Sequence, residues 1–427
     1  MADRLRVAVT ARAVYPAHGV GGLERHVFDL VRHLARANAE ITLITRAGPT
    51  PASWGPEGRL VRVIAVPYLT FPFAGRRGTT ILDRDTAYPV FGWRVGRRAL
   101  ELVRRGEIDV VYGLGASAFG YAAALGHDHT AGAPLVFNPQ GLEEFGGTDP
   151  SAAALKRLAY WPLQRVVTFC AQRADCTIAT DSVLEPVVRA HLGLAPSRIR
   201  VIPNAIDVDA CDAFTSSPAS RRLRAEATAA GGRVLLSVGR IEANKGFDVL
   251  AHALARLPAG LDWRWILVGD GPARPSLERM LASLGLERRV RLTGRVDDDV
   301  LHGWYEAADI FVHPTRYEGS SLVTLEAMAH RKPILATLAG GLPDKVRPGV
   351  NGWLVPPGDV EALAAALTEA LVSPGLGTMG LASREIVDET FSWPHVTARM
   401  ISVYKEVLAS RRKESAAGGR FQGLRRA

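Results

Sequence analysis

The sequence predicts an α/β protein with two doubly wound domains, each a parallel sheet covered by helices, that face one another across a cleft. Two observations predict this architecture. Short β-branched runs alternate with helical patterns along nearly the whole chain, and the alternation pauses once, after residue 203, before it restarts. The length of 427 residues is enough for two domains of about 150–200 residues each.

The first half of the chain opens with a strand at residues 6–10. The apolar residues at positions 23, 27, 30, 31 and 34 that follow it share one face of a helix. Further strands are predicted at 41–45, 61–66, 109–112, 135–138, 176–180 and 199–202, with helical patterns in most of the gaps. These elements define an N-terminal domain at 1–208.

Residues 209–232 have weaker periodicity and are interpreted as a linker with a short helix. Beyond them, a second domain is predicted at 233–392, with strands at 234–238, 265–268, 290–293, 310–313 and 334–337 and helices at 247–257, 276–284, 322–330 and 360–371. Ligands of such sheets bind beyond the carboxyl ends of the strands. The residues that directly follow each strand are therefore the first candidates for a site.

Composition and charge exclude several classes of protein. The chain is 47% hydrophobic, which is too apolar for a disordered chain, and its three cysteines form no C-x-x-C pair, as expected of free thiols in a reducing compartment. Neither a spanning segment nor a secretory signal is recognised, so a cytoplasmic location is predicted, with at most a peripheral position on the inner face of the membrane. The net charge of +9 is diffuse and no nucleic-acid-binding motif is found, which favours anionic small molecules or an anionic membrane over nucleic acid.

The strongest functional signal is the polar, glycine-containing turn that follows the strand at 310–313 and leads into a helix near residue 322. Backbone N–H groups at the start of that helix suit a phosphate. Glu318 stands before the helix and Glu326 within it, and a fully helical chain between them would separate the carboxylates by about 12 Å. That span suits a sugar nucleotide, which has hydroxyl groups at both ends and a diphosphate between them. Taken alone, Glu326 would be an ordinary helix carboxylate.

A second signal lies at residues 238–246, where a strand ends in Arg240 and Lys245 opens the next helix. Two cations in these places can both point into the cleft and neutralise a diphosphate leaving group. Either cation alone would more often be a solvated surface charge. The pairing with the Glu318 segment is what makes the signal specific.

These segments resemble, in order, the group-1, or family-4, retaining glycosyltransferases of the GT-B fold, which has two Rossmann-like domains. The resemblance covers most of the chain and rests on Gly-Gly-Leu-Glu at 21–24, Val-Ile-Pro-Asn-Ala-Ile-Asp at 201–207, Val-Gly-Arg at 238–240, Lys-Gly at 245–246, Val-Gly-Asp-Gly at 268–271, the pair Glu318 and Glu326, and Asn-Gly-Trp-Leu-Val-Pro-Pro-Gly-Asp at 351–359. Phe-Ser-Trp at 391–393 and a helix at 393–410 match the segment with which family members return to the N-terminal domain. The basic residues 411–427 are predicted to form a disordered tail.

The resemblance implies that the domain at 1–208 binds the acceptor and that the domain at 233–392 binds the nucleotide sugar. It also implies a role for each matching residue. Arg240 and Lys245 would hold the donor diphosphate, Glu318 would contact the donor sugar, and Glu326 would accept hydrogen bonds from the ribose. Donor contacts are also implied for the backbone amides of Gly319, Ser320, Ser321 and Leu322, for Arg295 and Val296 at the nucleobase, and for Gly21 and Gly22, where the missing Cβ lets the backbone approach the diphosphate.

The sequence departs from the family pattern in three places, of which the mildest is Ala205, where the family usually has glycine after the asparagine at 204. Family members commonly carry His-Gly after a strand of the N-terminal domain, where this chain has Gln140 and Gly141. No catalytic imidazole is therefore carried over, and Gln140 is an acceptor-side candidate together with His18, which lies beside the glycines at 19–22. The serines at 320 and 321 replace a more common pair, an apolar residue followed by glycine. The Ser321 hydroxyl is a candidate hydrogen-bond donor to a phosphate.

We therefore expect a retaining hexosyltransferase that moves a sugar from a nucleoside-diphosphate donor to a hydroxyl acceptor, which is a glycan, a lipid-linked molecule or a small molecule. As the resemblance implies, protein groups stabilise the leaving charge in place of a divalent metal, so no metal or other cofactor is expected. His127 and His129 are spaced like metal ligands, but no third ligand is in view. The alternatives are a sugar-nucleotide epimerase or phosphorylase of the same fold and a non-catalytic sugar-nucleotide-binding protein.

The stretch between the strands at 61–66 and 109–112 combines aromatic and basic residues. Residues 68–77 contain three aromatics and two arginines, and a helix predicted at 90–105 carries Trp93 together with Arg94, Arg97 and Arg98. Such a mixture suits peripheral contact with an anionic membrane or a lipid-diphosphate acceptor. The simpler interpretation, a solvated basic helix beside an acceptor loop, is slightly favoured.

Overall fold

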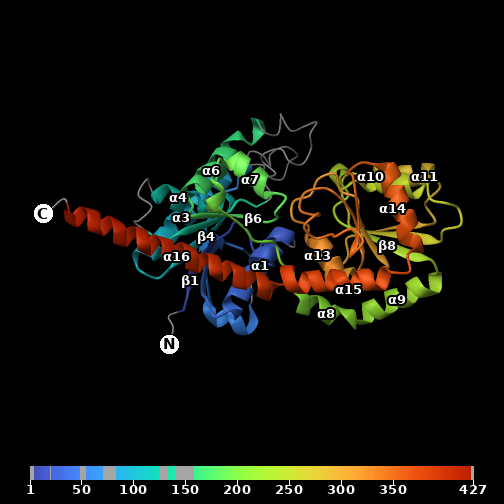
Figure 1. Ribbon diagram of the computed structural model, residues 1–427, viewed down its shortest axis with the longest axis horizontal. Helices are drawn as coiled ribbons and strands as arrows, with labels where there is room; N and C mark the ends of the chain where they lie inside the picture. Colours follow the sequence, from blue (N-terminus) through green and yellow to red (C-terminus); the bar gives the residue numbers. More distant parts are fainter. Residues whose placement is uncertain are drawn as a thin grey trace. The chain divides into compact units, whose positions relative to one another are not determined.

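The computed structural model describes residues 4–19, 21–48, 54–70, 83–125, 132–140 and 158–424. It divides into two compact units, the first formed by Met1–Pro203 with Val396–Ala427 and the second by Asn204–His395. Each unit contains one parallel sheet with helices on its faces (Figure 1). The predicted α/β class with two doubly wound domains is confirmed. The division falls at residues 203/204 rather than at the predicted 208/209.

The first unit is built on seven parallel strands in the order β3-β2-β1-β4-β5-β6-β7. Their bounds are β1 (Arg6–Thr10), β2 (Glu40–Arg46), β3 (Val61–Val66), β4 (Val110–Leu114), β5 (Leu135–Asn138), β6 (Cys176–Ala179) and β7 (Ile199–Val201). The central strands β1 and β4 are buried along almost their whole length, because helices cover both of their faces. These helices are α1 (Gly22–Arg36), α3 (Ala87–Arg104), α4 (Phe119–Ala124), α6 (Trp161–Arg173), α7 (Glu185–Leu192) and the later part of α16 (Trp393–Leu424).

The second unit is built on six parallel strands in the order β10-β9-β8-β11-β12-β13. Their bounds are β8 (Arg233–Val238), β9 (Trp263–Val268), β10 (Val290–Gly294), β11 (Ile310–His313), β12 (Ile334–Thr337) and β13 (Gly352–Val355). One face packs against α10 (Phe247–Leu254), α11 (Arg274–Ser283) and α14 (Val360–Val372), and the other against α12 (Asp298–Ala307) and α13 (Leu322–Ala329) (Figure 1). The sequence patterns do not predict β13, because four residues within a run rich in glycine and proline show no clear period.

The predicted linker at 209–232 is part of the second unit. It forms α8 (Val208–Thr215) and α9 (Pro218–Ala230), and α8 is capped by Asp207, whose carboxylate accepts a hydrogen bond from the Ala210 N–H at 3.0 Å. Cys211 and Leu223 are 2% and 3% exposed and join the core on the α12 side of the sheet. Apolar burial of only a few side chains is enough to dock both helices, which explains why the sequence shows weak periodicity there.

The predicted disordered tail is wrong for residues 411–424, which continue α16 as a helix. Six of the seven residues at 411–417 are arginine, lysine, glutamate or alanine, which are strong helix formers, whereas the glycines at 418, 419 and 423 are poor ones. Arg411 is also buried, and its Nη2 donates to Oδ2 of Asp175 at 2.8 Å. This ion pair within the first unit anchors the helix beyond the point at which the sequence predicts its end.

Among the described residues, no single helix has both the length and the apolar composition of a membrane span. One bent pair, α14 with the segment Leu376–Phe391 that contains α15 (Leu376–Ile386), passes by length and composition only.

Candidate active site

Three polar side chains meet at the carboxyl ends of β8 and β11, which are neighbours in the second sheet. Lys245 lies in the segment after β8, and its Nζ is 2.7 Å from Oε2 of Glu318, in the segment after β11. His313 is the last residue of β11, and its Nε2 is 2.7 Å from the same carboxylate oxygen. The structure therefore brings together the two segments that the sequence singles out, and it adds a histidine to them.

Glu318 is a largely buried, ionised carboxylate. Its side chain is 15% exposed, and that of His313 is 1% exposed. Burial alone would raise the pKa of Glu318, but the hydrogen bond from His313 and the charge of Lys245 outweigh burial and lower this pKa to about 2. Because an ionised carboxylate only accepts hydrogen bonds, Lys245 and His313 both donate to it, His313 through its Nε2–H. At neutral pH Glu318 thus holds the Lys245 ammonium in place.

Two glycines allow the segments that carry these side chains to lie against one another. Gly246 has a φ of +68°, and a Cβ at this position would lie 2.0 Å from the carbonyl oxygen of Pro314. Gly340 has a φ of +52°, and a Cβ there would lie 1.7 Å from the carbonyl oxygen of Glu318. Only glycine fits both the left-handed conformation and the close approach.

The start of α13 has the features of an anion site. The first N–H groups of a helix have no partner within the helix. Ser321 is the N-cap, and its hydroxyl oxygen accepts a hydrogen bond from the Thr324 hydroxyl at 2.9 Å. Ser320 is held by Lys345, a fully buried lysine whose Nζ is 3.3 Å from the Ser320 Oγ. A helix start on a turn fixed in this way suits a phosphate group.

Glu326 lies within α13, and Oη of Tyr305 on α12 is 2.8 Å from its Oε2. The helix begins only at Leu322, so four of the eight residue steps between Glu318 and Glu326 are not helical. The separation of about 12 Å, which assumes a helical rise throughout, therefore does not apply. Both carboxylates nevertheless belong to one continuous segment that follows β11.

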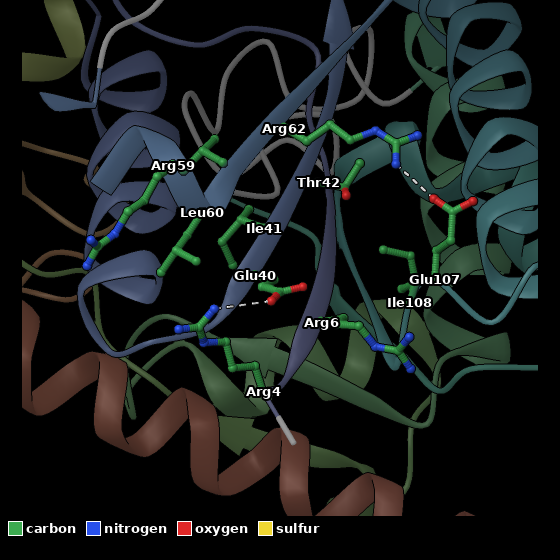
Figure 2. A pocket seen from close by; sticks show the side chains of 11 residues that line it. Arg4, Arg6, Glu40, Ile41, Thr42, Arg59, Leu60, Arg62, Glu107 and Ile108 are labelled. Carbon is green, nitrogen blue, oxygen red and sulfur yellow. Dashed lines mark hydrogen bonds and ion pairs between the residues drawn. The ribbon is translucent and has the colours of Figure 1, made fainter. Parts of the chain in front are cut away.

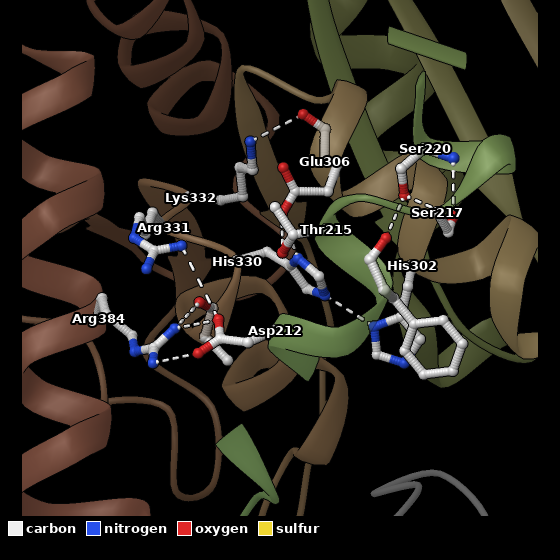
Figure 3. A network of polar contacts seen from close by, with 12 residues as sticks. Asp212, Thr215, Ser217, Ser220, His302, Glu306, His330, Arg331, Lys332 and Arg384 are labelled. Carbon is white, nitrogen blue, oxygen red and sulfur yellow. Dashed lines mark hydrogen bonds and ion pairs between the residues drawn. The ribbon is translucent and has the colours of Figure 1, made fainter. Parts of the chain in front are cut away.

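One cluster in the described part of the second unit has the composition of a metal site. Cys211, His302 and His330 each offer a ligand atom, and these atoms lie within 4.8 Å of one another. However, Nδ1 of His302 and Nε2 of His330 are 2.7 Å apart, and Nδ1 of His330 is 2.6 Å from a carboxylate oxygen of Glu306 (Figure 3). The facing ring nitrogens are thus already used by hydrogen bonds, and we describe the cluster as a hydrogen-bonded chain.

Comparison with known proteins identifies the family. The family model described as "Glycosyl transferases group 1" matches residues 232–373, and "Glycosyltransferase Family 4" matches residues 20–210. Over 409 residues the chain is 31% identical to the D-inositol 3-phosphate glycosyltransferase of Xylanimonas cellulosilytica, with 92% of this chain and 93% of that protein covered. The chain belongs to the group-1, family-4 glycosyltransferases.

Solved structures similar to this glycosyltransferase have the GT-B fold. The sucrose-phosphate synthase of Thermosynechococcus elongatus matches with a TM-score of 0.69 and 22% identity over 95% of this chain and 100% of that chain. Anabaena HepE, solved in complex with UDP, matches with a TM-score of 0.68 and 21% identity over 95% and 100% of the two chains. At these identities the likeness shows the fold alone.

On the second unit of the glycosyltransferase, the two predicted cations are not equivalent. The Arg240 side chain is 64% exposed, and its Nε pairs with Oε1 of Glu242 at 3.0 Å, whereas Lys245 pairs with Glu318. Arg295 and Val296 follow β10; Arg295 is exposed and Val296 packs against the apolar core. Their contact with a nucleobase stays a prediction, as do the donor contacts of Gly319, Ser320, Ser321 and Leu322.

In the first unit, the predicted residues lie on the segments that follow β1 and β5. Gly21 is the N-cap of α1 and Gly22 is its first residue. Gln140 has a φ of +66°, which is uncommon for a residue with a Cβ, and its N–H donates to Oδ1 of Asn138 at 2.8 Å. Nδ1 of His18 accepts a backbone N–H at 3.0 Å, and burial lowers its pKa, which favours a neutral ring with its proton on Nε2. The functions of these residues stay predictions, and His127 and His129 lie outside the described residues.

Sequence reasoning missed three residues of the site: His313, Tyr305 and Lys345. His313 ends a predicted strand, so the rule that ligands bind beyond strand ends was a usable signal. Tyr305 and Lys345 offer no such signal, because a tyrosine in a helix and a lone lysine in a loop match many surface positions. Their burial becomes evident only from the packing of the second unit.

A separate pocket of about 530 Å³ opens in the first unit at the amino ends of β1, β2 and β3 (Figure 2). Four arginines line it, and carboxylates of the lining pair with two of them: Arg62 pairs with Glu107 at 2.8 Å, and Arg4 pairs with Glu40 at 3.5 Å. The pocket lies at the edge of the sheet opposite to the carboxyl ends where ligands of this fold bind. We assign it no part in glycosyl transfer.

Proposed function

We propose that this glycosyltransferase moves a hexose-type sugar from a nucleoside-diphosphate sugar to a hydroxyl acceptor and retains the configuration of the anomeric carbon. The observation that carries the proposal is the contact of Lys245 and His313 with Glu318 in the segment that leads into α13. It unites a cation for a diphosphate, a fixed carboxylate for sugar hydroxyls and the N–H groups of a helix start. Anabaena HepE, solved with UDP and with UDP-glucose, supports this class of donor.

In this proposal the bond between the anomeric carbon and the diphosphate oxygen breaks, and its electron pair stays on the diphosphate. Lys245, Arg240 and the backbone N–H groups of Gly319 to Leu322 stabilise the charge that develops there. Glu318 accepts hydrogen bonds from the donor sugar and fixes the anomeric carbon. Glu326 accepts hydrogen bonds from the ribose at the other end of the donor.

Retention follows if the acceptor oxygen forms its bond on the face that the diphosphate leaves. The proton of the acceptor hydroxyl then passes to an oxygen of the departing phosphate, so that no side-chain base is required. Because Lys245, Arg240 and the helix start of α13 supply the charge stabilisation that a divalent cation otherwise provides, we propose that transfer needs neither a metal nor another cofactor. We place His18 and Gln140 on the acceptor side.

We also propose that α3 contacts an anionic membrane surface, which would favour a lipid-linked acceptor. Val90 and Trp93 are 50% and 44% exposed, and Arg94 and Arg97 are exposed on the same face of the helix. An indole ring beside arginines suits the headgroup region, and each arginine near an anionic surface contributes about 1 kcal/mol. Residues 71–77 of the aromatic and basic stretch at 68–77 lie outside the described residues.

Sedimentation with liposomes at low salt tests the membrane contact. We expect the protein to bind vesicles that contain an anionic lipid and not neutral vesicles, and we expect the double variant Arg94→Glu/Arg97→Glu to lose this binding. Equal partitioning to both vesicle types, or full binding by the variant, contradicts the contact.

A thermal-shift screen against UDP-, GDP-, ADP- and TDP-sugars, followed by incubation of the stabilising donor with acceptors, tests the main proposal. We expect a shift with one nucleotide class and acceptor-dependent release of the nucleoside diphosphate. Three outcomes contradict the proposal: isomerisation of the donor without acceptor indicates an epimerase, turnover that depends on inorganic phosphate indicates a phosphorylase, and binding without turnover indicates a binding protein.

A further inference from the structure

In the second unit, polar side chains of α12 and α13, most of them buried and Glu326 half-buried, lie against one another. His302, Tyr305 and Glu306 are spaced by three and four residues, which puts them on one face of α12. Glu326 and His330 are four residues apart at the end of α13 and share one face in the same way. The rings of Tyr305 and His330 stack, with centroids 5.5 Å apart and planes inclined by 5°.

The Tyr305 hydroxyl binds one oxygen of Glu326. Its Oη is 2.8 Å from Oε2 of Glu326 and 3.2 Å from the carbonyl oxygen of Val323. A phenol has one hydrogen to donate, and the carboxylate of Glu326 is both the nearer and the stronger acceptor. Tyr305 therefore donates to Glu326. Tyr305 is fully buried, and burial and the neighbouring charge of Glu326 raise the pKa of Tyr305 well above its ordinary value. The hydroxyl therefore keeps its hydrogen at any pH suitable for an assay.

A row of hydrogen-bonded side chains fixes the ring of Tyr305. His330, which stacks on Tyr305, is hydrogen bonded to Glu306 at 2.6 Å and to His302 at 2.7 Å (Figure 3). The His302 ring in turn stacks on Phe214 of α8, with centroids 4.3 Å apart and planes inclined by 4°. Because each of these rings is fixed by a stack or a hydrogen bond, the Tyr305 hydroxyl has little freedom to leave Glu326.

We propose that Tyr305 is a positioning residue that aims the Glu326 carboxylate at the ribose of the donor. The inference rests on the proposed function, in which Glu326 accepts hydrogen bonds from ribose hydroxyls. A glutamate on a helix surface has several rotamers, and a fixed hydrogen bond to one oxygen selects the orientation of the whole carboxylate. Preference for ribose over 2′-deoxyribose therefore depends on Tyr305, although Tyr305 itself does not touch the nucleotide.

The test compares Tyr305→Phe, which removes only the hydroxyl, with Tyr121→Phe. Tyr121 of α4 is equally buried in the first unit and donates to the carbonyl oxygen of Ala133 at 2.6 Å, so it controls for the loss of a buried phenol. Calorimetry gives the Kd of UDP, GDP and ADP and of their 2′-deoxy counterparts. For the nucleotide that binds, we expect the wild type and Tyr121→Phe to prefer the ribonucleotide about tenfold and Tyr305→Phe to retain about a threefold preference or less.

Kinetics separate positioning from a general structural role. Because Glu326 contacts ribose equally before and during transfer, Tyr305→Phe should raise the KM for the donor and leave kcat almost unchanged. In a Glu326→Ala background, Tyr305→Phe should have no further effect on the ribose preference. This second comparison measures the coupling between Tyr305 and Glu326 in the ribose preference, even if Tyr305→Phe lowers the melting temperature.

Each other outcome overturns the inference in a recognisable way. An unchanged ribose preference in folded Tyr305→Phe contradicts positioning, and an equal loss of affinity for both nucleotides indicates a structural role instead. If the wild type binds nucleotides but does not distinguish ribose from deoxyribose, the assignment of Glu326 fails and the inference fails with it. If the wild type binds none of the nucleotides, the proposed function itself fails.

Discussion

Replacement of Lys245 by methionine removes one charge and nearly preserves the length of the side chain. Two unit charges 4 Å apart interact by about 4 kcal/mol at an effective dielectric constant of 20 and by about 1 kcal/mol in water. The Lys245 side chain is 19% exposed and that of Arg240 is 64% exposed. The interaction of Lys245 with the diphosphate is therefore at most about 4 kcal/mol, and that of Arg240 at most about 1 kcal/mol. Because Glu318 offsets part of the attraction between Lys245 and the donor diphosphate, we take about 2–3 kcal/mol, below the limit of about 4 kcal/mol, as the contribution of Lys245. We therefore expect kcat/KM to fall about 30- to 150-fold in Lys245→Met and about fivefold in Arg240→Met.

The assay measures the initial rate of nucleoside-diphosphate release against donor concentration. Arg256→Met is the matched control, because Arg256 forms an exposed ion pair with Glu361 in the same unit and has no assigned part in transfer. Circular dichroism and melting temperatures establish that each variant is folded. Equal losses in Lys245→Met and Arg240→Met would refute the argument from burial. An unchanged kcat/KM in folded Lys245→Met would remove Lys245 from the diphosphate site.

Three further predictions follow from the same site. Steady-state kinetics should show that Glu326→Ala raises the donor KM more than it lowers kcat, whereas Glu318→Ala chiefly lowers kcat; the opposite pattern would exchange the two ends of the donor. Proton NMR should show a product with the donor's anomeric configuration, and activity should survive EDTA. An inverted product would contradict retention, while a loss that Mn²⁺ restores would contradict only transfer without metal. The pKa of Glu318 is lowered from 4.5 to about 2 in the folded protein, so its contribution to stability is complete above about pH 4.5 and is lost as the pH falls toward 2. Between pH 5 and pH 2, the free energy of unfolding in urea should therefore fall by about 3 kcal/mol more in the wild type than in Glu318→Gln. Parallel losses in the two proteins would contradict the contacts of Glu318 with Lys245 and His313.

The strands and helices that carry the site are predictable from the sequence because their signals are local. The strand at 310–313 is predicted with the bounds of β11, and the helix at 322–330 differs from α13 by one residue. A short β-branched run followed by a polar turn and a periodic apolar segment contains this information within about 20 residues. The motifs, taken in order, then indicate the family, and the comparisons confirm this family.

The contacts within the site are not predictable in the same way, because they depend on register between distant segments. Tyr305 and Glu326 are 21 residues apart, and Lys245 and Glu318 are 73 residues apart. No local pattern indicates that a phenol on one helix reaches a carboxylate on the next. The contact that anchors the helix beyond residue 410 is equally distant in sequence, since the ion pair of Arg411 with Asp175 spans 236 residues.

The difference between Lys245 and Arg240 shows how packing assigns unequal surroundings to residues that look equivalent in the sequence. Both cations follow β8, but only Lys245 directly precedes Gly246, whose backbone approaches Pro314 so closely that a Cβ there would lie 2.0 Å from the carbonyl oxygen. That approach fixes the segment after β8 against the segment after β11, which carries Glu318. The ammonium of Lys245 is therefore held at the carboxylate, while Arg240 extends toward solvent and pairs with a sequence neighbour. A residue with no side chain thus determines which of the two charges lies in the partly buried site, where charge acts most strongly.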